Sequence, residues 1–202
     1  MTTAVFDIGG VVVVWDPVPA VAAVVGQERA EHFVHGGEFD FAAWNAAQDA
    51  GRSFADAEAE ARASHPHLAD EIAAYLPHFA LSLTGLVPGT ADLLAALHAH
   101  GVRLVALTNW SAETIHHGLE TYPAVFALFD DIVVSGAEGV AKPDQEIFRV
   151  LARRLGQPLD GVFYVDDNVH NVDAARSAGM DAVHFTDAAG LDEELRRRRL
   201  LA

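Results

Sequence analysis

The chain has 202 residues, of which 51% are hydrophobic and 21% charged, so it is long enough and apolar enough to bury one ordinary core. Its 29 acidic and 13 basic residues give a net charge of −16, which argues against nucleic acid or an anionic membrane as the main partner. The absence of cysteine excludes a disulfide framework, a thiolate nucleophile and cysteine-ligated zinc.

Apolar runs predict five buried strands. The first is Ala4 to Phe6, which opens into a loop loosened by Gly9 and Gly10. The other strands are predicted at 102–107, 132–134, 162–165 and 182–185. Helical patterns lie between them, at about 92–100, 112–121, 144–155, 170–178 and 190–200. Alternating helices and fully apolar strands predict an α/β fold, a doubly wound Rossmann-like parallel sheet covered on both faces.

The stretch from Asp16 to Leu86 breaks this alternation, because it holds helical patterns and no convincing strand. Helices are expected near 17–25, 28–35, 39–50, 54–63 and 68–83. The simplest architecture is a core of residues 1–15 and 87–202 with a helical cap, residues 16–86, inserted after the first strand. Ligands of doubly wound sheets bind at the carboxyl ends of the strands, so this cap would form a lid over the site.

Polar residues follow the predicted strands in four groups, which are Asp7, Thr108-Asn109, Lys142-Pro143 and Asp166-Asp167. A carboxylate such as Asp7 can attack phosphorus, and together with Asp167 it can hold Mg²⁺, which prefers hard oxygen ligands. Thr108 can donate a hydrogen bond to phosphate, and Lys142, the only lysine of the chain, adds a compact positive charge. The four groups together predict phosphoryl transfer.

Each group also has a purely structural interpretation. Asp7 would be a turn residue and Thr108-Asn109 a helix cap. Lys142-Pro143 would be an ordinary loop with Pro at the first helical position, and Asp166-Asp167 an exposed turn. Their occurrence in this order on successive strand ends favours the functional interpretation. For Trp15 and Trp110, lining a substrate pocket and closing the core are equally open.

These groups resemble the four motifs of the haloacid dehalogenase superfamily. They are Phe6-Asp7-Ile8-Gly9-Gly10-Val11, Leu107-Thr108-Asn109, Ala141-Lys142-Pro143 and Val165-Asp166-Asp167-Asn168. The resemblance covers about 1–15 and 87–187, and residues 16–86 stand where the family's helical cap belongs. Within the family, the chain is most similar to small sugar-phosphate phosphatases of the glucose-1-phosphatase type and to the phosphatase half of bifunctional epoxide hydrolases.

The resemblance implies a role for each motif residue. Asp7 would be the nucleophile and a magnesium ligand, and Gly9 would give a backbone carbonyl to the metal. Asp167 would be the second carboxylate on the metal, with Asp166 behind it in the outer coordination sphere.

The remaining motif residues would act on the phosphate. Thr108, with Asn109 beside it, would bind the transferring phosphoryl group. Lys142 would stabilise the charge of that group and orient Asp7.

Two positions depart from the family pattern. Most family phosphatases have a second Asp, the general acid and base, where this chain has Gly9, although the glucose-1-phosphatase-like relatives also have Gly there. Without this acid we expect a steep dependence of the rate on leaving-group pKa, whereas a shallow dependence would point to a cap donor, for which Glu38 and Asp40 are the candidates. Asn171 stands where many members have Asp. Dehalogenases use that acid, and have Tyr in place of Gly9, so dehalogenation is not expected.

The sequence therefore predicts a magnesium-dependent phosphatase-type hydrolase that acts on a small phosphorylated metabolite, such as a sugar phosphate. The alternative is a phosphate-binding or regulatory protein with little turnover, because the usual general acid is Gly9. No Lys or Arg precedes Arg29, and no apolar run is long enough for a bilayer. We accordingly expect a soluble cytoplasmic monomer or homodimer without nucleic-acid or membrane partners.

Overall fold

The structure is a computed structural model that describes residues 2–202. Its centre is a five-stranded sheet of order β5-β4-β1-β6-β7, in which every neighbouring pair is parallel. The strands are β1 (Thr3–Phe6), β4 (Arg103–Thr108), β5 (Asp131–Val134), β6 (Phe163–Asp166) and β7 (Asp181–His184). The predicted doubly wound α/β sheet is confirmed, and each predicted strand end falls within one residue of the observed one.

The central strand β1 is the point where the strand order reverses. From β1 the chain builds outward through β4 and β5, and then crosses back to add β6 and β7 on the other side. Val5 of β1 accordingly pairs with Val105 on one side and Tyr164 on the other. Because all five strands are parallel, their carboxyl ends lie along one edge of the sheet, and ligands of such folds bind where the order reverses.

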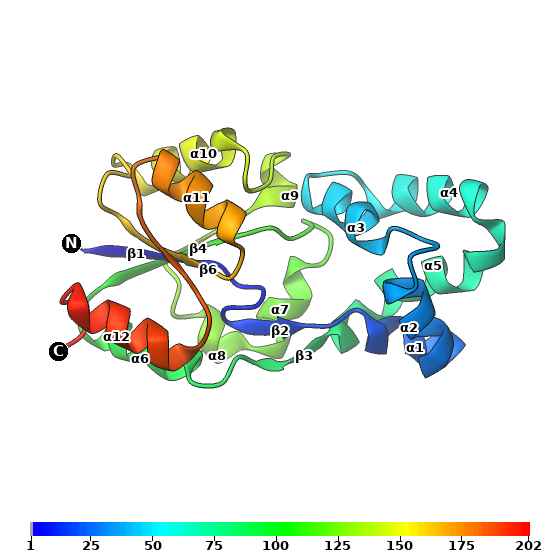
Figure 1. Ribbon diagram of the computed structural model, residues 1–202, viewed down its shortest axis with the longest axis horizontal. Coiled ribbons are helices and arrows are strands. Elements are labelled where there is room, and N and C mark those ends of the chain that lie inside the picture. The colour runs from blue at the N-terminus through cyan, green and yellow to red at the C-terminus, as the bar shows by residue number, and fades with distance from the viewer. Residues whose placement is uncertain (1) are drawn as a thin grey trace.

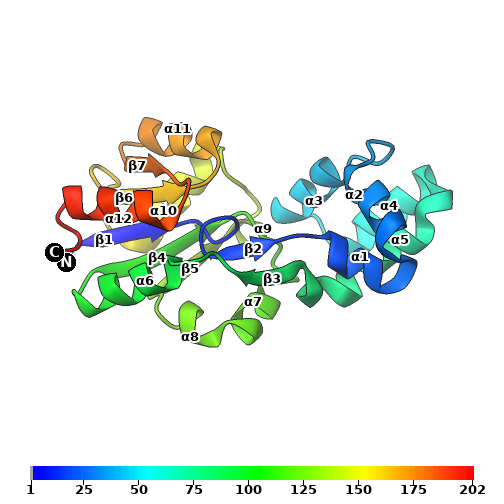
Figure 2. The ribbon, with the colours of Figure 1, turned by 60° about the horizontal axis from the view of Figure 1, so that its bottom comes forward.

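Helices cover both faces of this sheet (Figures 1 and 2). One face carries α10 (Gln145–Leu155) and α11 (Val169–Ser177), while the other carries α6 (Thr90–Ala99), α7 (Ile115–Thr121), α8 (Pro123–Phe126) and α12 (Ala188–Arg197). Alternate residues of β1 supply the two cores, since Ala4 and Phe6 pack into one and Val5 into the other. The four-residue helices α8 and α9 (Ser135–Glu138) were not predicted, because they are too short to show a period.

Two further strands, β2 (Val13–Trp15) and β3 (Leu83–Leu86), form an antiparallel pair through which the chain leaves the sheet and returns. The prediction that 16–86 holds no strand is therefore wrong at β3. This strand is short, contains Gly85 and pairs with a segment about seventy residues away, so no local pattern marks it.

The segment between β2 and β3 is entirely helical in its regular structure and projects beyond the carboxyl edge of the sheet (Figure 1). Its helices are α1 (Val18–Val25), α2 (Gln27–His35), α3 (Phe41–Asp49), α4 (Phe54–Ser64), η1 (Pro66–Leu68), α5 (Ala69–Tyr75) and η2 (Leu76–Ser82). Tyr75 is fully buried at its centre, with ring centroids of four other aromatic residues 5.2 to 6.0 Å away. Within residues 2–202, no helix has the length and apolar character needed to cross a membrane.

Candidate active site

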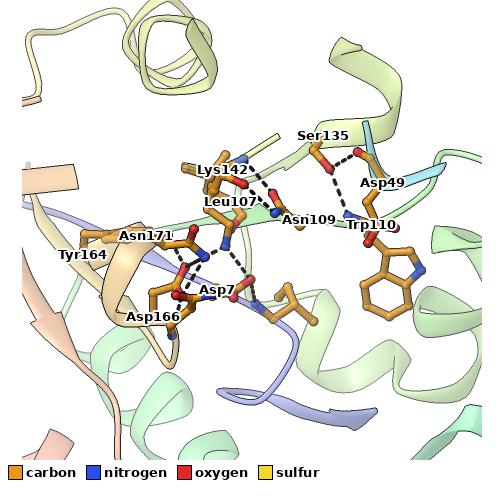
Figure 3. Close-up of polar contacts among 12 residues, drawn as sticks. Asp7, Asp49, Leu107, Asn109, Trp110, Ser135, Lys142, Tyr164, Asp166 and Asn171 are labelled. Carbon is orange, nitrogen blue, oxygen red and sulfur yellow. Dashed lines mark hydrogen bonds and ion pairs between the residues drawn. The ribbon is translucent and has the colours of Figure 1, made fainter. Parts of the chain in front are cut away.

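A buried lysine joins two of the four motif groups at the carboxyl edge of the sheet. The Lys142 ammonium lies 2.9 Å from Asp7 Oδ1, in the loop after β1, and 2.7 Å from Asp166 Oδ2, at the end of β6. It also donates a hydrogen bond of 2.9 Å to the carbonyl of Leu107 in β4 (Figure 3). The three N–H groups of one ammonium thus hold three neighbouring strands together.

The lysine side chain is completely buried, so its charge persists only because it is paired. Burial lowers the pKa of Lys142, but the charges of Asp7 and Asp166 more than offset this, and the net pKa is raised. Asn109 fixes the loop that carries it, since its side-chain amide donates to the Lys142 carbonyl and accepts from the Lys142 N–H, both at 2.9 Å. A compact ammonium suits three separate acceptors better than a planar guanidinium does.

Asp166 has no exposed surface, and both of its oxygens are occupied. Oδ2 accepts from Lys142 and from the Tyr164 hydroxyl, and Oδ1 accepts from the backbone N–H of Asn168. Burial raises the pKa of Asp166, but the Lys142 ammonium and these hydrogen bonds lower it by more than burial raises it. The net pKa is therefore below its usual value. Asp166 is therefore an anion whose oxygens are already committed to positioning the lysine.

Asn171, which departs from the family pattern, is hydrogen-bonded to Asp166. Its amide nitrogen donates to both oxygens of Asp166, at 3.1 and 3.2 Å. A carboxylate at position 171 would set a second negative charge against Asp166 in a buried place. The amide instead supplies the donor that the buried anion requires.

Tyr164 was missed in the sequence analysis, although it is fully buried and donates its hydroxyl to Asp166. The signal was available, because residues two apart on a strand point to the same face and Tyr164 lies two before Asp166. Lys142-Pro143 does not begin a helix, since α10 has Asp144 as its N-cap. The structural interpretation that placed Pro143 at the first helical position is wrong.

Asp7 and Asp167 keep oxygens free beside the lysine cluster. Asp7 Oδ1 accepts the Ile8 N–H at 2.7 Å and the Lys142 ammonium, whereas Oδ2 accepts no hydrogen bond from the residues that the structure describes. Burial raises the pKa of Asp7 to about 7, with Lys142 opposing the shift and Asp166 and Asp167 adding to it. Asp167 is exposed, and one oxygen each of Asp7, Asp166 and Asp167 lie within 4.8 Å of one another.

The loop after Asp7 is shaped around the Asp167 side chain. A Cβ atom on Gly10 would lie 2.1 Å from Asp167 Oδ2, and Gly10 has a φ of +71°, in the left-handed region. A side chain there would push the carboxylate out of place. Gly9 differs, because a Cβ atom on Gly9 would meet nothing within 4 Å. The place where a side chain at position 9 would stand is open space.

Gly9 also lines a cavity of about 140 Å³ between the sheet edge and the helices of 18–82. Its lining residues are Gly9, Val13, Trp15, Asn45, Asp49, Tyr75, Phe79, Asn109 and Trp110. Trp15 and Trp110 both line this cavity, and Trp110 is also buried in the core, so both interpretations apply to Trp110. Four of these nine residues are aromatic, and the polar side-chain groups that the nine carry include two amides, one carboxyl and the Tyr75 hydroxyl.

Glu38 and Asp40, the candidates for a proton donor from the cap, are both exposed and absent from the cavity wall. Glu38 pairs with His67 at 2.7 Å, and Asp40 caps α3 by accepting the Ala43 N–H. Both carboxylates have local partners at the surface, so the structure favours neither of these two candidates.

The chain matches a protein-family model, individual proteins and solved structures. A family model described as haloacid dehalogenase-like hydrolase matches residues 1–179. The chain is 34% identical over 106 residues to a sesquiterpene phosphatase of Aspergillus oryzae, which is 52% of this chain and 54% of that protein. It is 33% identical over 104 residues to a phosphoglycolate phosphatase of Salmonella paratyphi A, which is 51% of this chain and 40% of that protein. The matches thus span about half the length of these relatives, or less.

Among solved structures, the chain resembles a haloacid dehalogenase family enzyme of Bacteroides thetaiotaomicron in its magnesium complex. The TM-score is 0.75 at 19% identity, and the match covers 97% of this chain and 98% of that one. The likeness extends over sheet, helices and insertion alike, and at this identity it concerns the fold.

Proposed function

The chain belongs to the haloacid dehalogenase-like hydrolases, and from this premise we propose that it is a magnesium-dependent phosphatase that works through an aspartyl phosphate on Asp7. One observation carries the proposal. Lys142 ties Asp7 Oδ1 to Asp166, while Asp7 Oδ2, at the carboxyl edge of the sheet, accepts no hydrogen bond from residues 2–202. An oriented carboxylate oxygen next to a buried ammonium is what attack on a phosphomonoester requires. Gly9, in place of the Tyr of the dehalogenases, argues against dehalogenation.

The carboxylates around Asp7 suit a hard divalent cation. Their oxygens converge within 4.8 Å, and Gly10 leaves room for the Asp167 carboxylate where any side chain would displace it. Asp7, Asp167 and the Gly9 carbonyl would hold Mg²⁺, with Asp166 outside the direct ligands because Lys142, Tyr164 and Asn171 occupy its oxygens. Bound magnesium would offset the repulsion between the Asp7 carboxylate and an anionic phosphate.

In the first step Asp7 Oδ2 would form a bond to phosphorus while the bond to the leaving-group oxygen breaks. Water would then cleave the acyl phosphate and restore the carboxylate. Lys142 would hold Asp7 in place and stabilise the charge of the phosphoryl group, which Thr108 and Asn109 would bind from the end of β4. Thr108 is buried there as the last residue of the strand.

The substrate would be a small phosphomonoester whose leaving group occupies the cavity beside Gly9. Trp15, Tyr75, Phe79 and Trp110 favour an apolar or flat leaving group over a sugar of the same size. This proposal includes the division of the chain into a core of 1–15 and 87–202 and a cap of 16–86. It also includes a relation to the glucose-1-phosphatase-like members of the family. Gly9 supports the latter. The proposed enzyme acts on soluble metabolites in the cytoplasm, as a monomer or homodimer.

Hydrolysis of an activated aryl phosphate tests the proposal, because its good leaving group needs no general acid. We expect turnover with magnesium and its loss on addition of a chelator. A folded protein that binds phosphate but does not turn this ester over would instead be the phosphate-binding or regulatory protein. A panel of sugar, aryl and terpenyl monophosphates would then rank leaving groups, and the cavity predicts higher kcat/KM for the apolar ones.

A further inference from the structure

The proposed reaction lacks a proton donor at the position where most family phosphatases have one. Gly9 carries no side chain and lines the cavity. An alkoxide that leaves phosphorus unprotonated is a poor leaving group, and general acid catalysis is worth about 10²–10⁴-fold. A carboxyl group elsewhere on the cavity wall could do this work.

Asp49 is the one carboxyl among the lining residues of this cavity, and it comes from the cap side. It is the last residue of α3, and its carbonyl accepts a hydrogen bond from the Ser135 hydroxyl of α9 (Figure 3). Ser135 in turn accepts the N–H of Trp110, the residue after the Thr108-Asn109 motif. The end of α3 is therefore attached to the sheet edge itself.

Gly51, two residues after Asp49, also packs closely against the α9 region. Gly51 has a φ of +102°, and a Cβ atom on it would lie 3.1 Å from Gly139 Cα and 3.3 Å from the Gly136 carbonyl. The backbone around Asp49 thus packs on the α9 region so closely that a side chain at position 51 would displace its neighbours and strain its own backbone. This close packing fixes where the Asp49 side chain starts.

A chain of hydrogen bonds fixes the direction of that side chain. Trp15 Nε1 donates to the Tyr75 hydroxyl at 3.2 Å, and this hydroxyl donates to Asn45 Oδ1 at 3.3 Å. The Asn45 amide nitrogen then donates to Asp49 Oδ2 at 3.0 Å. All four residues line the cavity, and the chain delivers one neutral donor to one oxygen of Asp49.

We propose that Asp49 is the general acid of this enzyme and replaces, from the cap, the carboxyl that position 9 lacks. This inference rests on the proposed phosphatase function. The Asp49 carboxyl gives its proton to the leaving-group oxygen as the bond from phosphorus to that oxygen breaks and the bond to Asp7 Oδ2 forms. In the second step Asp49 takes a proton from the water that attacks phosphorus, which releases Asp7 as a carboxylate and phosphate as product. Each turnover returns both carboxyl groups to their starting states.

The electrostatic environment agrees with this role. Burial raises the pKa of Asp49 to about 7, only partly opposed by the Ser111 backbone and by Lys142. A carboxyl with such a pKa is protonated in a large fraction of molecules at neutral pH, as a general acid must be. Asn45 and Tyr75 are positioning residues, because they act on Asp49 rather than on the substrate.

The wild-type protein provides the first test. A plot of log kcat/KM against leaving-group pKa, for a series from activated aryl to alkyl phosphates, should be shallow. This replaces the expectation of a steep dependence drawn from Gly9 alone. A steep plot for the wild-type protein would overturn the inference while leaving the phosphatase proposal intact, since the activated esters would still be hydrolysed.

Asp49→Asn keeps the shape of the side chain and its acceptor for Asn45 but removes the proton. We expect about 10²-fold or greater loss with an alkyl phosphate, and less than about threefold loss with an activated aryl phosphate. Glu38→Gln is the matched control, a carboxyl of the same cap held at the surface by His67, and it should change neither rate. Equal losses with both esters would assign Asp49 a structural role and overturn the inference.

Gly9→Asp provides a complementary test, because a side chain at position 9 meets open space. In the Asp49→Asn background this change should restore a large part of the alkyl phosphate activity. In the wild-type background it should add little, since an acid is already in place. A gain of about 10²-fold from Gly9→Asp alone would show that Asp49 donates no proton, whether or not Asp49→Asn folds.

Discussion

The carboxyl groups at the sheet edge and the carboxyl group on the cap side of the cavity have different partners. At the sheet edge, Asp7 and Asp166 share one buried ammonium, and Asp166 also accepts hydrogen bonds from Tyr164, Asn168 and Asn171. On the cap side, Asp49 meets a neutral amide at the end of a hydrogen-bond chain through Tyr75 and Trp15. Despite burial, Lys142 keeps the pKa of Asp166 below its usual value, whereas burial raises the pKa of both Asp7 and Asp49 to about 7. In the proposed mechanism, one residue type accordingly serves as nucleophile, lysine partner and proton donor.

The sheet edge and the cap side of the cavity also differ in how they are built. Parallel strands bring their carboxyl ends together whatever covers them, so the charged cluster is built from strand ends and the loops next to them. The cap contributes through helix packing and aromatic contacts, which set the shape of the cavity. We expect substitutions on the sheet side to affect chemistry or stability strongly, and those on the cap side to affect which esters are hydrolysed.

Asp167→Ala should produce the largest separation between activity and stability. The side chain is exposed, so the free energy of unfolding should change by no more than about 0.5 kcal/mol. Loss of a metal ligand should lower magnesium-dependent kcat by about 10³-fold or more, equivalent to ~4 kcal/mol. Denaturant unfolding and aryl phosphate kinetics on one preparation measure both. Retained activity would remove Asp167 from the metal site.

Asp166→Ala should show the reverse balance. It leaves Lys142 with one buried partner and strips the acceptor from Tyr164 and Asn171, so we expect a loss of about 3–5 kcal/mol in the free energy of unfolding. Activity of the folded fraction should fall by about 10- to 100-fold, as when groups behind a metal ligand are changed. A larger loss of activity than for Asp167→Ala would mean that the two carboxylates have been assigned to each other's roles.

Asn171→Asp should perturb the buried Asp166 carboxylate less than Asp166→Ala does. The new carboxyl would face Asp166 across a gap now bridged by an amide, and we expect a loss of about 1–3 kcal/mol at neutral pH. Burial and Asp166 would raise the folded-state pKa of the new carboxyl above its unfolded value. The stability difference from wild type should therefore grow as the pH rises through that folded pKa and shrink in acid. A difference that does not vary with pH would contradict this account.

Tyr75→Phe should have the smallest effect, confined to the cap wall. It removes the hydroxyl between Trp15 and Asn45 but keeps the buried ring among its aromatic neighbours. We expect a cost of about 1 kcal/mol in stability, and about fivefold lower alkyl phosphate turnover with aryl phosphate turnover unchanged. An equal fall with both esters would place the effect in folding rather than in the orientation of Asp49.

Much of the sheet wall was predictable, because fully apolar strands and the polar residues after them carry local signals. Asp7, Lys142 and Asp166 are brought together as expected from parallel strand ends. The task of Asn109 was only partly foreseen, since its amide binds the Lys142 backbone. Asp49 gave no local signal, because it reaches the cavity only through the packing of α3 on α9. The antiparallel pairing of β2 and β3 was hidden for the same reason, since its partners are distant in the chain.

The role of Asp7 as nucleophile is tested most directly by Asp7→Asn, measured with an activated aryl phosphate and magnesium. The change keeps the shape of the side chain but removes the attacking anion, and Lys142 retains Asp166 as its partner. We expect kcat to fall by at least about 10³-fold, ~4 kcal/mol, in a protein whose circular dichroism spectrum and unfolding transition show that it is folded. Turnover close to that of the wild type from this folded variant would contradict the aspartyl-phosphate mechanism.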